Sequence, residues 1–182
     1  AQYPTHGHDP AFWEMLGRVV ATYGFLEEVL GKAIFSFTAT RHYEEHEIED
    51  AYRKWLPTLE RALYDPLGAL ITSYEKAVRD NQSATSENLD DLIAALREAA
   101  KQRNVLCHGS WRLPDENGAS RPFFVNRNME VFDTAIDIDW LAQVQRHVAK
   151  LACDVMNTVT DMGWRFPGSK GPGEPIFERG RQ

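Results

Sequence analysis

Residues 89–109 read LDDLIAALREAAKQRNVLCHG, and the fold prediction starts from this stretch. Its apolar side chains recur at three- and four-residue steps, the spacing of one face of an α-helix. Gly109 follows the last turn, and glycine commonly takes the left-handed conformation that ends a helix. We therefore expect a helix that ends near His108, with Arg103 on its core-facing side. The expected stripe consists of Leu89, Ile93, Leu96, Ala100, Arg103 and Cys107.

Two longer helices are predicted from the same periodicity on either side of this stretch. Residues 10–39 carry an apolar stripe that begins after Asp9, a capping residue followed by proline. Residues 138–162 carry another stripe, and Asp137 stands at the capping position before it. Both stripes give their helix one face to bury against a neighbour.

A different pattern precedes the last helix. The dipeptide Asn117-Gly118 lies between two short apolar runs, residues 111–113 and 122–125. An Asn-Gly pair between such runs is a strong signal for a β-hairpin. We therefore expect the only regular strands of the chain at about 110–132.

One or two further helices are expected over residues 43–79, with breaks near Pro57 and Pro66 because proline interrupts a helix. The whole chain is predicted to be all-α, a four- to five-helix up-down bundle with a small β-hairpin inserted before the last helix. This bundle covers residues 1–163. Residues 164–182 are rich in glycine and proline and are predicted to form a C-terminal tail.

Composition narrows the class of protein. With 182 residues the chain is long enough for one domain with its own core. Two cysteines are too few for a disulfide framework, so we expect a reducing cytoplasm. No apolar run reaches the roughly 20 residues that span a bilayer, and no basic-plus-apolar leader opens the chain. We expect a cytoplasmic protein that does not associate with membranes.

The charge pattern limits any nucleic-acid contact to a local site. The formal net charge of −7 excludes a surface that is basic throughout. Between residues 97 and 127, however, cations exceed carboxylates by three, which predicts a basic patch near the end of the 89–108 helix. Ordinary solvated charges would give the same count. The residues are Arg97, Lys101, Arg103, Arg112, Arg121 and Arg127 against Glu98, Asp115 and Glu116.

Arg103 occupies a helix position where leucine would be expected. A buried guanidinium needs a partner or an opening to water, because an unpaired buried charge costs several kcal/mol. In a structural interpretation, Arg103 pairs with a carboxylate of the first helix, for which Glu27 is the best candidate. In a functional interpretation, the stripe opens into a cleft and Arg103 faces an anion.

Two neighbours of Arg103 support a shared site. Asn104 and His108 are four residues apart and lie on one face of the helix. His108 is also at the negative end of the helix dipole, which favours the protonated imidazole. These three side chains are able to bind a phosphate, orient it and move a proton.

The run Arg103-Asn104-Val105-Leu106-Cys107-His108 resembles the Arg-Asn-x-x-x-His signature of the HEPN superfamily. The expected helical bundle over residues 10–163, with the motif late in the third or fourth helix, is similar to the fold of that superfamily. The resemblance at the level of single residues covers the motif alone.

The resemblance implies a metal-independent endoribonuclease that dimerises so that two motif copies meet in one cleft. In that case His108 assists proton transfer as a ribose 2'-OH attacks its own phosphate, Arg103 stabilises the phosphoryl oxygens and Asn104 orients the groups. The product carries a cyclic phosphate. Other HEPN proteins keep the fold and serve as binding or interaction modules.

Residues beside the motif are candidates for binding substrate. Arg112 and Lys101 are expected to contact phosphates, and Trp111 to stack on a base, as Phe123 also could. The alternative for both aromatic side chains is that they pack the hairpin onto the bundle.

Other groups of reactive residues carry weaker signals. His42 and His46 have the spacing of metal ligands on a helix, but the surrounding run is polar and lacks further ligands, which favours a solvated face. Cys107 next to His108 has the form of a nucleophile, although a cysteine packed in the core is favoured. We expect no metal and no cofactor.

The sequence therefore predicts a HEPN-like endoribonuclease, by analogy related to toxins or phage defence. Its expected partners are RNA, a second copy of the chain, and a cognate antitoxin or other partner protein. The alternatives are a non-catalytic HEPN-like dimeric binding module and a purely structural bundle.

Overall fold

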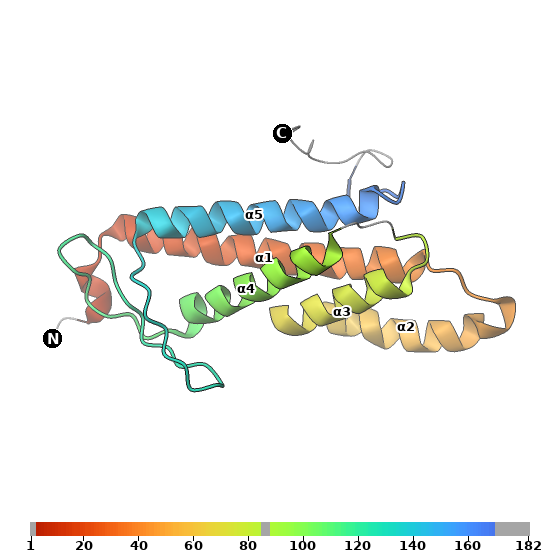
Figure 1. Cartoon of the computed structure of the whole chain (residues 1–182), viewed down its shortest axis with the longest axis horizontal. Coiled ribbons are helices and arrows are strands. Elements are labelled where there is room, and N and C mark those ends of the chain that lie inside the picture. The colour runs from red at the N-terminus through yellow and green to blue at the C-terminus, as the bar shows by residue number, and fades with distance from the viewer. Residues whose placement is uncertain (1–2, 85–87, 170–182) are drawn as a thin grey trace. The chain divides into compact units, whose positions relative to one another are not determined.

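The computed structural model of the chain describes residues 3–84 and 88–169. Within these residues the regular structure is entirely helical, which confirms the all-α class (Figure 1). Searched over the same ranges, no helix is long and apolar enough to cross a membrane. The α-helices are α1 (Pro10–Ala39), α2 (Ile48–Ala62), α3 (Leu67–Asp80), α4 (Leu89–His108) and α5 (Ile138–Thr160), and two short 3-10 helices are η1 (Pro4–Gly7) and η2 (Glu45–Glu47).

The chain divides into two compact units. The first unit contains residues 1–24 and 98–149, and the second contains residues 25–97 and 150–182. Helices α1, α4 and α5 are each divided between the two units, with one segment in each. The predicted division between a bundle at 1–163 and a tail at 164–182 stays a prediction, because residues 170–182 lie outside the described part of the chain.

The first unit is built from segments of α1, α4 and α5 and the long connection between α4 and α5. The predicted caps are present: Asp9 accepts a hydrogen bond from the backbone N–H of Ala11 at 2.8 Å, and Asp137 accepts one from the N–H of Trp140 at 2.7 Å. Helices α1 and α5 run side by side in this unit (Figure 1). The buried apolar residues are Phe12, Leu16, Val19, Tyr23, Ala99, Val105, Leu106, Ile136, Leu141, Val144 and Val148.

The predicted hairpin is wrong, although its turn is correctly placed. Gly118 adopts a left-handed φ of 80°, and the backbone N–H of Asp115 donates to the carbonyl of Ala119 at 2.8 Å. No ladder follows on either side of this turn. Proline has no N–H to donate, so Pro114 and Pro122 prevent the two segments from pairing continuously. Among the described residues only isolated antiparallel bridges form, at Ser110–Phe123, Ser120–Ile136 and Val125–Val131.

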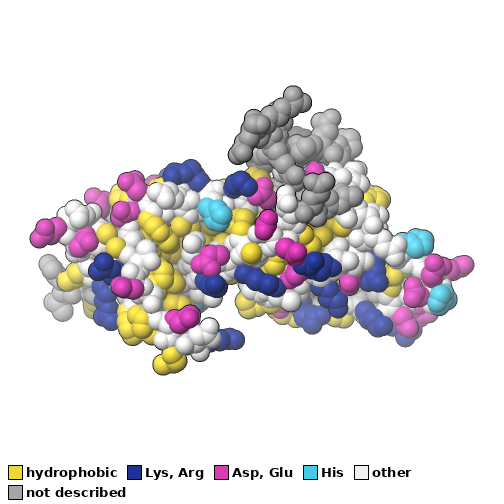
Figure 2. Space-filling model, viewed as in Figure 1, with side chains coloured by type: hydrophobic (Ala, Val, Ile, Leu, Met, Phe, Trp, Pro, Cys, Tyr) yellow, Lys and Arg dark blue, Asp and Glu magenta, His cyan; other side chains and the backbone are white. Residues whose placement is uncertain are grey.

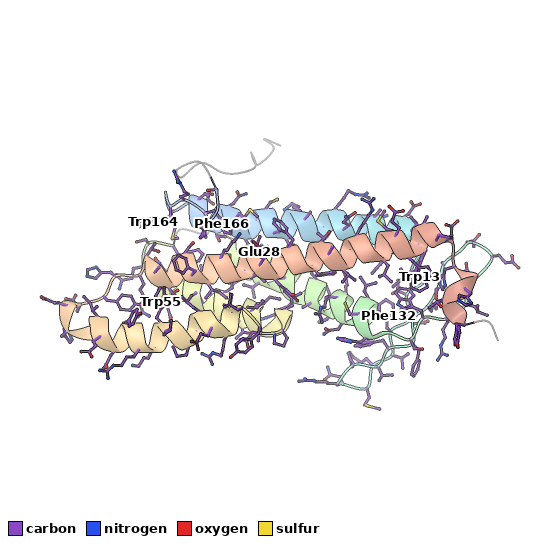
Figure 3. The ribbon with its side chains drawn as sticks, turned by 180° about the vertical axis from the view of Figure 1, so that it is seen from behind. Trp13, Glu28, Trp55, Phe132, Trp164 and Phe166 are labelled. Carbon is purple, nitrogen blue, oxygen red and sulfur yellow. The ribbon has the colours of Figure 1, made fainter. Side chains whose placement is uncertain are left out.

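The second unit contains the remaining segments of α1, α4 and α5 together with α2 and α3. Buried polar groups connect its helices at specific points. Asn81, at the end of α3, donates to the backbone carbonyl of Phe37 on α1 at 2.7 Å. The hydroxyl groups of Tyr74 on α3 and Thr158 on α5 lie 2.9 Å apart. Phe166, just beyond α5, is buried in this unit (Figure 3).

Only one of the two expected helix breaks occurs. The break near Pro66 is confirmed, because α2 ends at Ala62 and α3 begins at Leu67 with Pro66 as its N-cap. The break near Pro57 is wrong, because Pro57 lies inside α2. Pro57 and Arg53 are both exposed, so water can satisfy the carbonyl that loses its N–H partner to proline.

Candidate functional site

The last turn of α4 separates its apolar and polar side chains. Val105 and Leu106 are buried in the first unit, whereas Asn104 and His108 are exposed. Arg103 is half-buried between these two sets. The motif therefore presents its functional groups at the surface while the residues inside it anchor the helix.

Cys107 is exposed, so the interpretation as a packed core cysteine is wrong. The inward positions of this turn belong to Val105 and Leu106, and each following residue rotates about 100° around the helix. That rotation turns Cys107 away from the core.

Arg103 and His108 meet at the end of α4. Nη1 of Arg103 lies 3.5 Å from Nε2 of His108. A guanidinium has no acceptor atom, so this contact is a hydrogen bond when Nε2 of His108 is unprotonated and accepts from Arg103. An unprotonated imidazole nitrogen can take a proton once the guanidinium turns away, and a guanidinium can bind a phosphate oxygen.

Gly109 lies where the end of the motif packs against the connection that follows α4. Glycine is needed at this position, but not for the reason expected from the sequence. Gly109 is absent from the described residues with a positive φ, so the predicted left-handed conformation is wrong. A Cβ at this position would instead lie 2.6 Å from the carbonyl oxygen of Val105 and 2.8 Å from Cβ of Pro122. Glycine is required here because the two segments approach closely.

Tyr23 lies near the motif and belongs to the apolar stripe expected over residues 10–39. Its ring is buried in the first unit, and its hydroxyl has no hydrogen-bond partner within the described ranges. Burial raises the pKa of Tyr23, Cys107 raises it further, and the Arg103 guanidinium lowers it. These influences place the phenol close to α4. No sequence signal distinguishes this tyrosine from an ordinary core residue.

Trp111 belongs to an aromatic cluster formed with the start of α1. Its ring packs edge-on against Phe12 and Trp13, with centroids 5.2 Å and 6.0 Å away, and a third edge-on neighbour is His8 at 6.4 Å. Trp13 also donates its indole N–H to the carbonyl of Thr5 at 3.0 Å (Figure 3). The cluster leaves Trp111 half-buried. Base stacking by Trp111 stays a prediction.

The expected basic patch is weaker than the residue count suggested. Lys101 pairs with Glu98 at 2.8 Å, and this hydrogen bond raises the pKa of Lys101. Arg121 lies 3.6 Å from Asp133. Arg97 belongs to the second unit and pairs there with Glu75 at 2.6 Å.

Residues 98–133 of the first unit contain five Lys and Arg residues and five Asp and Glu residues, so their formal charges cancel. Figure 2 shows dark blue and magenta side chains interspersed on the face drawn there. Arg112 was also expected to bind substrate. Its guanidinium lies 5.5 Å from the centroid of the Phe123 ring, a cation–π contact.

His42 and His46 do not share a helix face. His42 precedes η2, where its Nε2 lies 3.7 Å from Oε1 of Glu44, and His46 lies within η2. Over the described parts of the chain, no group of three or more His, Cys, Asp or Glu side chains is arranged to hold a metal ion.

Comparisons of the chain with protein-family models, with curated proteins and with solved structures gave no match. Function is therefore inferred from the geometry of the motif and from the resemblance of its residues to the HEPN signature.

Proposed function

We propose that the chain is a HEPN-like, metal-independent endoribonuclease whose catalytic residues are Arg103, Asn104 and His108. One observation carries the proposal: the Arg103 guanidinium and the His108 imidazole lie 3.5 Å apart at the exposed end of α4, with Asn104 exposed beside them. This end of the helix therefore offers a cation that can bind a phosphate and a nitrogen that can accept a proton.

The chemistry follows from the properties of these groups. Nε2 of a neutral His108 takes the proton of a ribose 2'-OH as the 2'-oxygen attacks the adjacent phosphorus. The bond from phosphorus to the 5'-oxygen breaks, and that oxygen leaves with a proton. Arg103 turns from His108 to the phosphoryl oxygens and stabilises their developing charge, while the Asn104 amide orients them. The products are a cyclic phosphate and a 5'-hydroxyl.

A single copy supplies one imidazole, whereas the reaction needs one group that accepts a proton and one that donates a proton. We therefore include in the proposal a homodimer in which two copies of the motif share one cleft, so that His108 of the second copy protonates the leaving oxygen. Arg112, Lys101 and Trp111 would contact the RNA around this cleft. A cytoplasmic setting, a cognate antitoxin or other partner protein, and a role in toxin or phage-defence systems belong to the same proposal.

A second candidate, a non-catalytic HEPN-like binding module, is favoured by the charges around the motif. Five cations and five carboxylates balance over residues 98–133, which gives little long-range attraction to a polyanion such as RNA. A binding module needs only a local anion site, and Arg103 can provide one.

The test is cleavage of a labelled single-stranded RNA by the purified full chain in the presence of EDTA. The products are examined by mass spectrometry for a terminal cyclic phosphate. We expect His108→Ala and Arg103→Ala to reduce the cleavage rate by at least about a hundredfold, as loss of a general base or a charge-stabilising donor does. The matched controls are His147→Ala and Arg146→Ala, which remove exposed side chains of α5 in the same unit.

Unchanged cleavage in His108→Ala would exclude the proposed mechanism, and so would cleavage of an RNA whose 2'-hydroxyls are methylated. RNA binding without cleavage by the wild type, lost in Arg103→Ala but kept in Arg146→Ala, would favour the binding module instead.

A further inference from the structure

Helix α2 carries an apolar face that the described residues of the second unit leave uncovered. None of the 15 residues of α2 is buried. Ile48, Tyr52 and Leu56 are spaced by four residues along one side of the helix, and Leu63 follows its last turn in the same direction. These four side chains are between 45% and 88% exposed. A row of exposed apolar side chains along one side of a helix is the kind of surface that a partner covers.

One edge of the same helix is already attached to its unit. The indole of Trp55 packs against Phe35 of α1, with ring centroids 5.8 Å apart, and donates its N–H to the hydroxyl of Thr38 at 2.8 Å (Figure 3). Trp55 and Leu59 are half-buried as a result. The helix is therefore anchored along one side of its apolar face, and the other side is open to water.

The spacing of this face is symmetric along the chain. Ile48 and Leu63 lie equally far from the midpoint between Trp55 and Leu56, and so do Tyr52 and Leu59. If two α2 helices run antiparallel about this midpoint, each apolar side chain meets an apolar side chain of the other copy. A pattern that complements itself in this way fits a two-fold pairing, in which the same surface is used on both copies.

The charges on and around α2 select the antiparallel direction. The segment that begins the helix is acidic and the segment that follows it is mainly basic, and Figure 2 shows acidic side chains gathered where α2 begins. Antiparallel pairing about this midpoint places Asp50 opposite Arg61 of the other copy, whereas parallel pairing would place each of these charges beside its own counterpart. The acidic end also disfavours an anionic membrane as the occupant. The acidic residues are Glu44, Glu45, Glu47, Glu49 and Asp50, and the basic ones are Arg53, Lys54 and Arg61, with Glu60 among them and Asp65 after them.

We propose that the apolar face formed by Ile48, Tyr52, Leu56, Leu59 and Leu63 pairs antiparallel with the same face of a second copy of the chain. This inference concerns the second unit and does not rest on the proposed ribonuclease activity of the first.

The first test is the oligomeric state of the full chain by sedimentation over about a hundredfold range of concentration, because association follows mass action. We expect the wild type to associate through this face and Leu56→Glu to weaken that association by at least about a hundredfold, since the variant places a carboxylate in an apolar contact. A dimer that forms at the motif would remain in this variant. Met129→Glu is the matched control, because Met129 is a more exposed apolar residue that lies outside this face. Circular dichroism checks that both variants are folded.

The second test uses substitutions that leave the face largely apolar. In a Cys107→Ser, Cys153→Ser background, Ile48→Cys and Leu63→Cys chains are treated with a short bismaleimide, separately and mixed. Packed helix axes lie about 8–10 Å apart, so only residues brought opposite each other are joined efficiently. We expect cross-linked dimers from the mixture and little from either chain alone.

A monomeric wild type would overturn the proposal and leave the face to the C-terminal residues or to another protein. Association that is the same in Leu56→Glu as in the wild type would overturn it as well, because no interface would then use this face. Efficient cross-linking of Ile48→Cys chains to each other would refute the antiparallel arrangement.

Discussion

Removal of the Tyr23 hydroxyl is expected to stabilise the protein, whereas removal of the Tyr74 hydroxyl is expected to destabilise it. Both rings are buried, and Tyr→Phe keeps the volume of either ring. The two hydroxyl groups differ in their hydrogen bonds. Tyr74 meets the hydroxyl of Thr158 at 2.9 Å, while Tyr23 has no partner in the part of the chain that the structure describes.

The magnitudes follow from these bonds. The hydroxyl of Thr158 donates its proton to the carbonyl of Val155 at 2.7 Å, so Tyr74 is the donor in their contact. Loss of that donor in Tyr74→Phe is expected to lower the free energy of unfolding by about 1 kcal/mol. A buried hydroxyl without a partner costs about 1–3 kcal/mol, so Tyr23→Phe is expected to raise the free energy of unfolding by about 1 kcal/mol or more.

The assay is urea denaturation followed by circular dichroism, with the two variants and the wild type measured side by side. For a chain of this length, each kcal/mol corresponds to roughly 2–4 °C in Tm, which gives an independent measurement. A loss of about 1 kcal/mol in Tyr23→Phe would refute the reasoning, because it would mean that this hydroxyl forms a stabilising hydrogen bond.

Three further predictions concern pH, packing and the motif. Burial raises the pKa of both tyrosines in the native state, so the unfolded chain loses these protons first as the pH rises. The free energy of unfolding should therefore fall above pH ~10 by about 1.4 kcal/mol per pH unit for each tyrosine, and the double phenylalanine variant should lack this part of the slope. Gly109→Ala should cost about 1–3 kcal/mol in urea denaturation because its Cβ would clash, whereas Gly17→Ala on α1, with open space around it, should stabilise by about 0.5–1 kcal/mol. The predicted ion pair of Glu27 and Arg103 should give a coupling above about 1 kcal/mol in a double-mutant cycle with Glu27→Gln and Arg103→Gln, and additive effects would argue against it.

The sequence predicted best what depends on neighbouring residues. The apolar stripe and the caps at Asp9 and Asp137 placed α1 at residues 10–39 and the start of α5 at residue 138, as observed. Helix periodicity and capping are local, because they involve residues three or four positions apart. The contact between Arg103 and His108 was within reach of the same reasoning, since both residues belong to the last two turns of α4.

Features that depend on contacts between distant segments were predicted less well. Cys107 was placed in the core because the stripe was extended to the end of α4, where Leu106 is the residue that packs inward. Gly109 was assigned a special backbone angle, but its requirement comes from Pro122, a partner 13 positions away that no local pattern reveals. The position of Tyr23 near the motif is of the same kind, because it depends on how α1 packs against α4.

The balance of charge around the motif bears on how the proposed nuclease would hold RNA. Lys101 and Arg121 are paired with carboxylates, so they would contribute less to phosphate binding than two unpaired cations. Affinity for a polyanion rises with the number of phosphates neutralised, and one copy of the motif region therefore offers few such contacts. A second copy doubles the number of Arg103 and Arg112 side chains without any change in sequence. On the proposed function, dimerisation accordingly serves substrate binding as well as proton transfer. An active monomer would have to obtain both from the few groups at the end of a single α4.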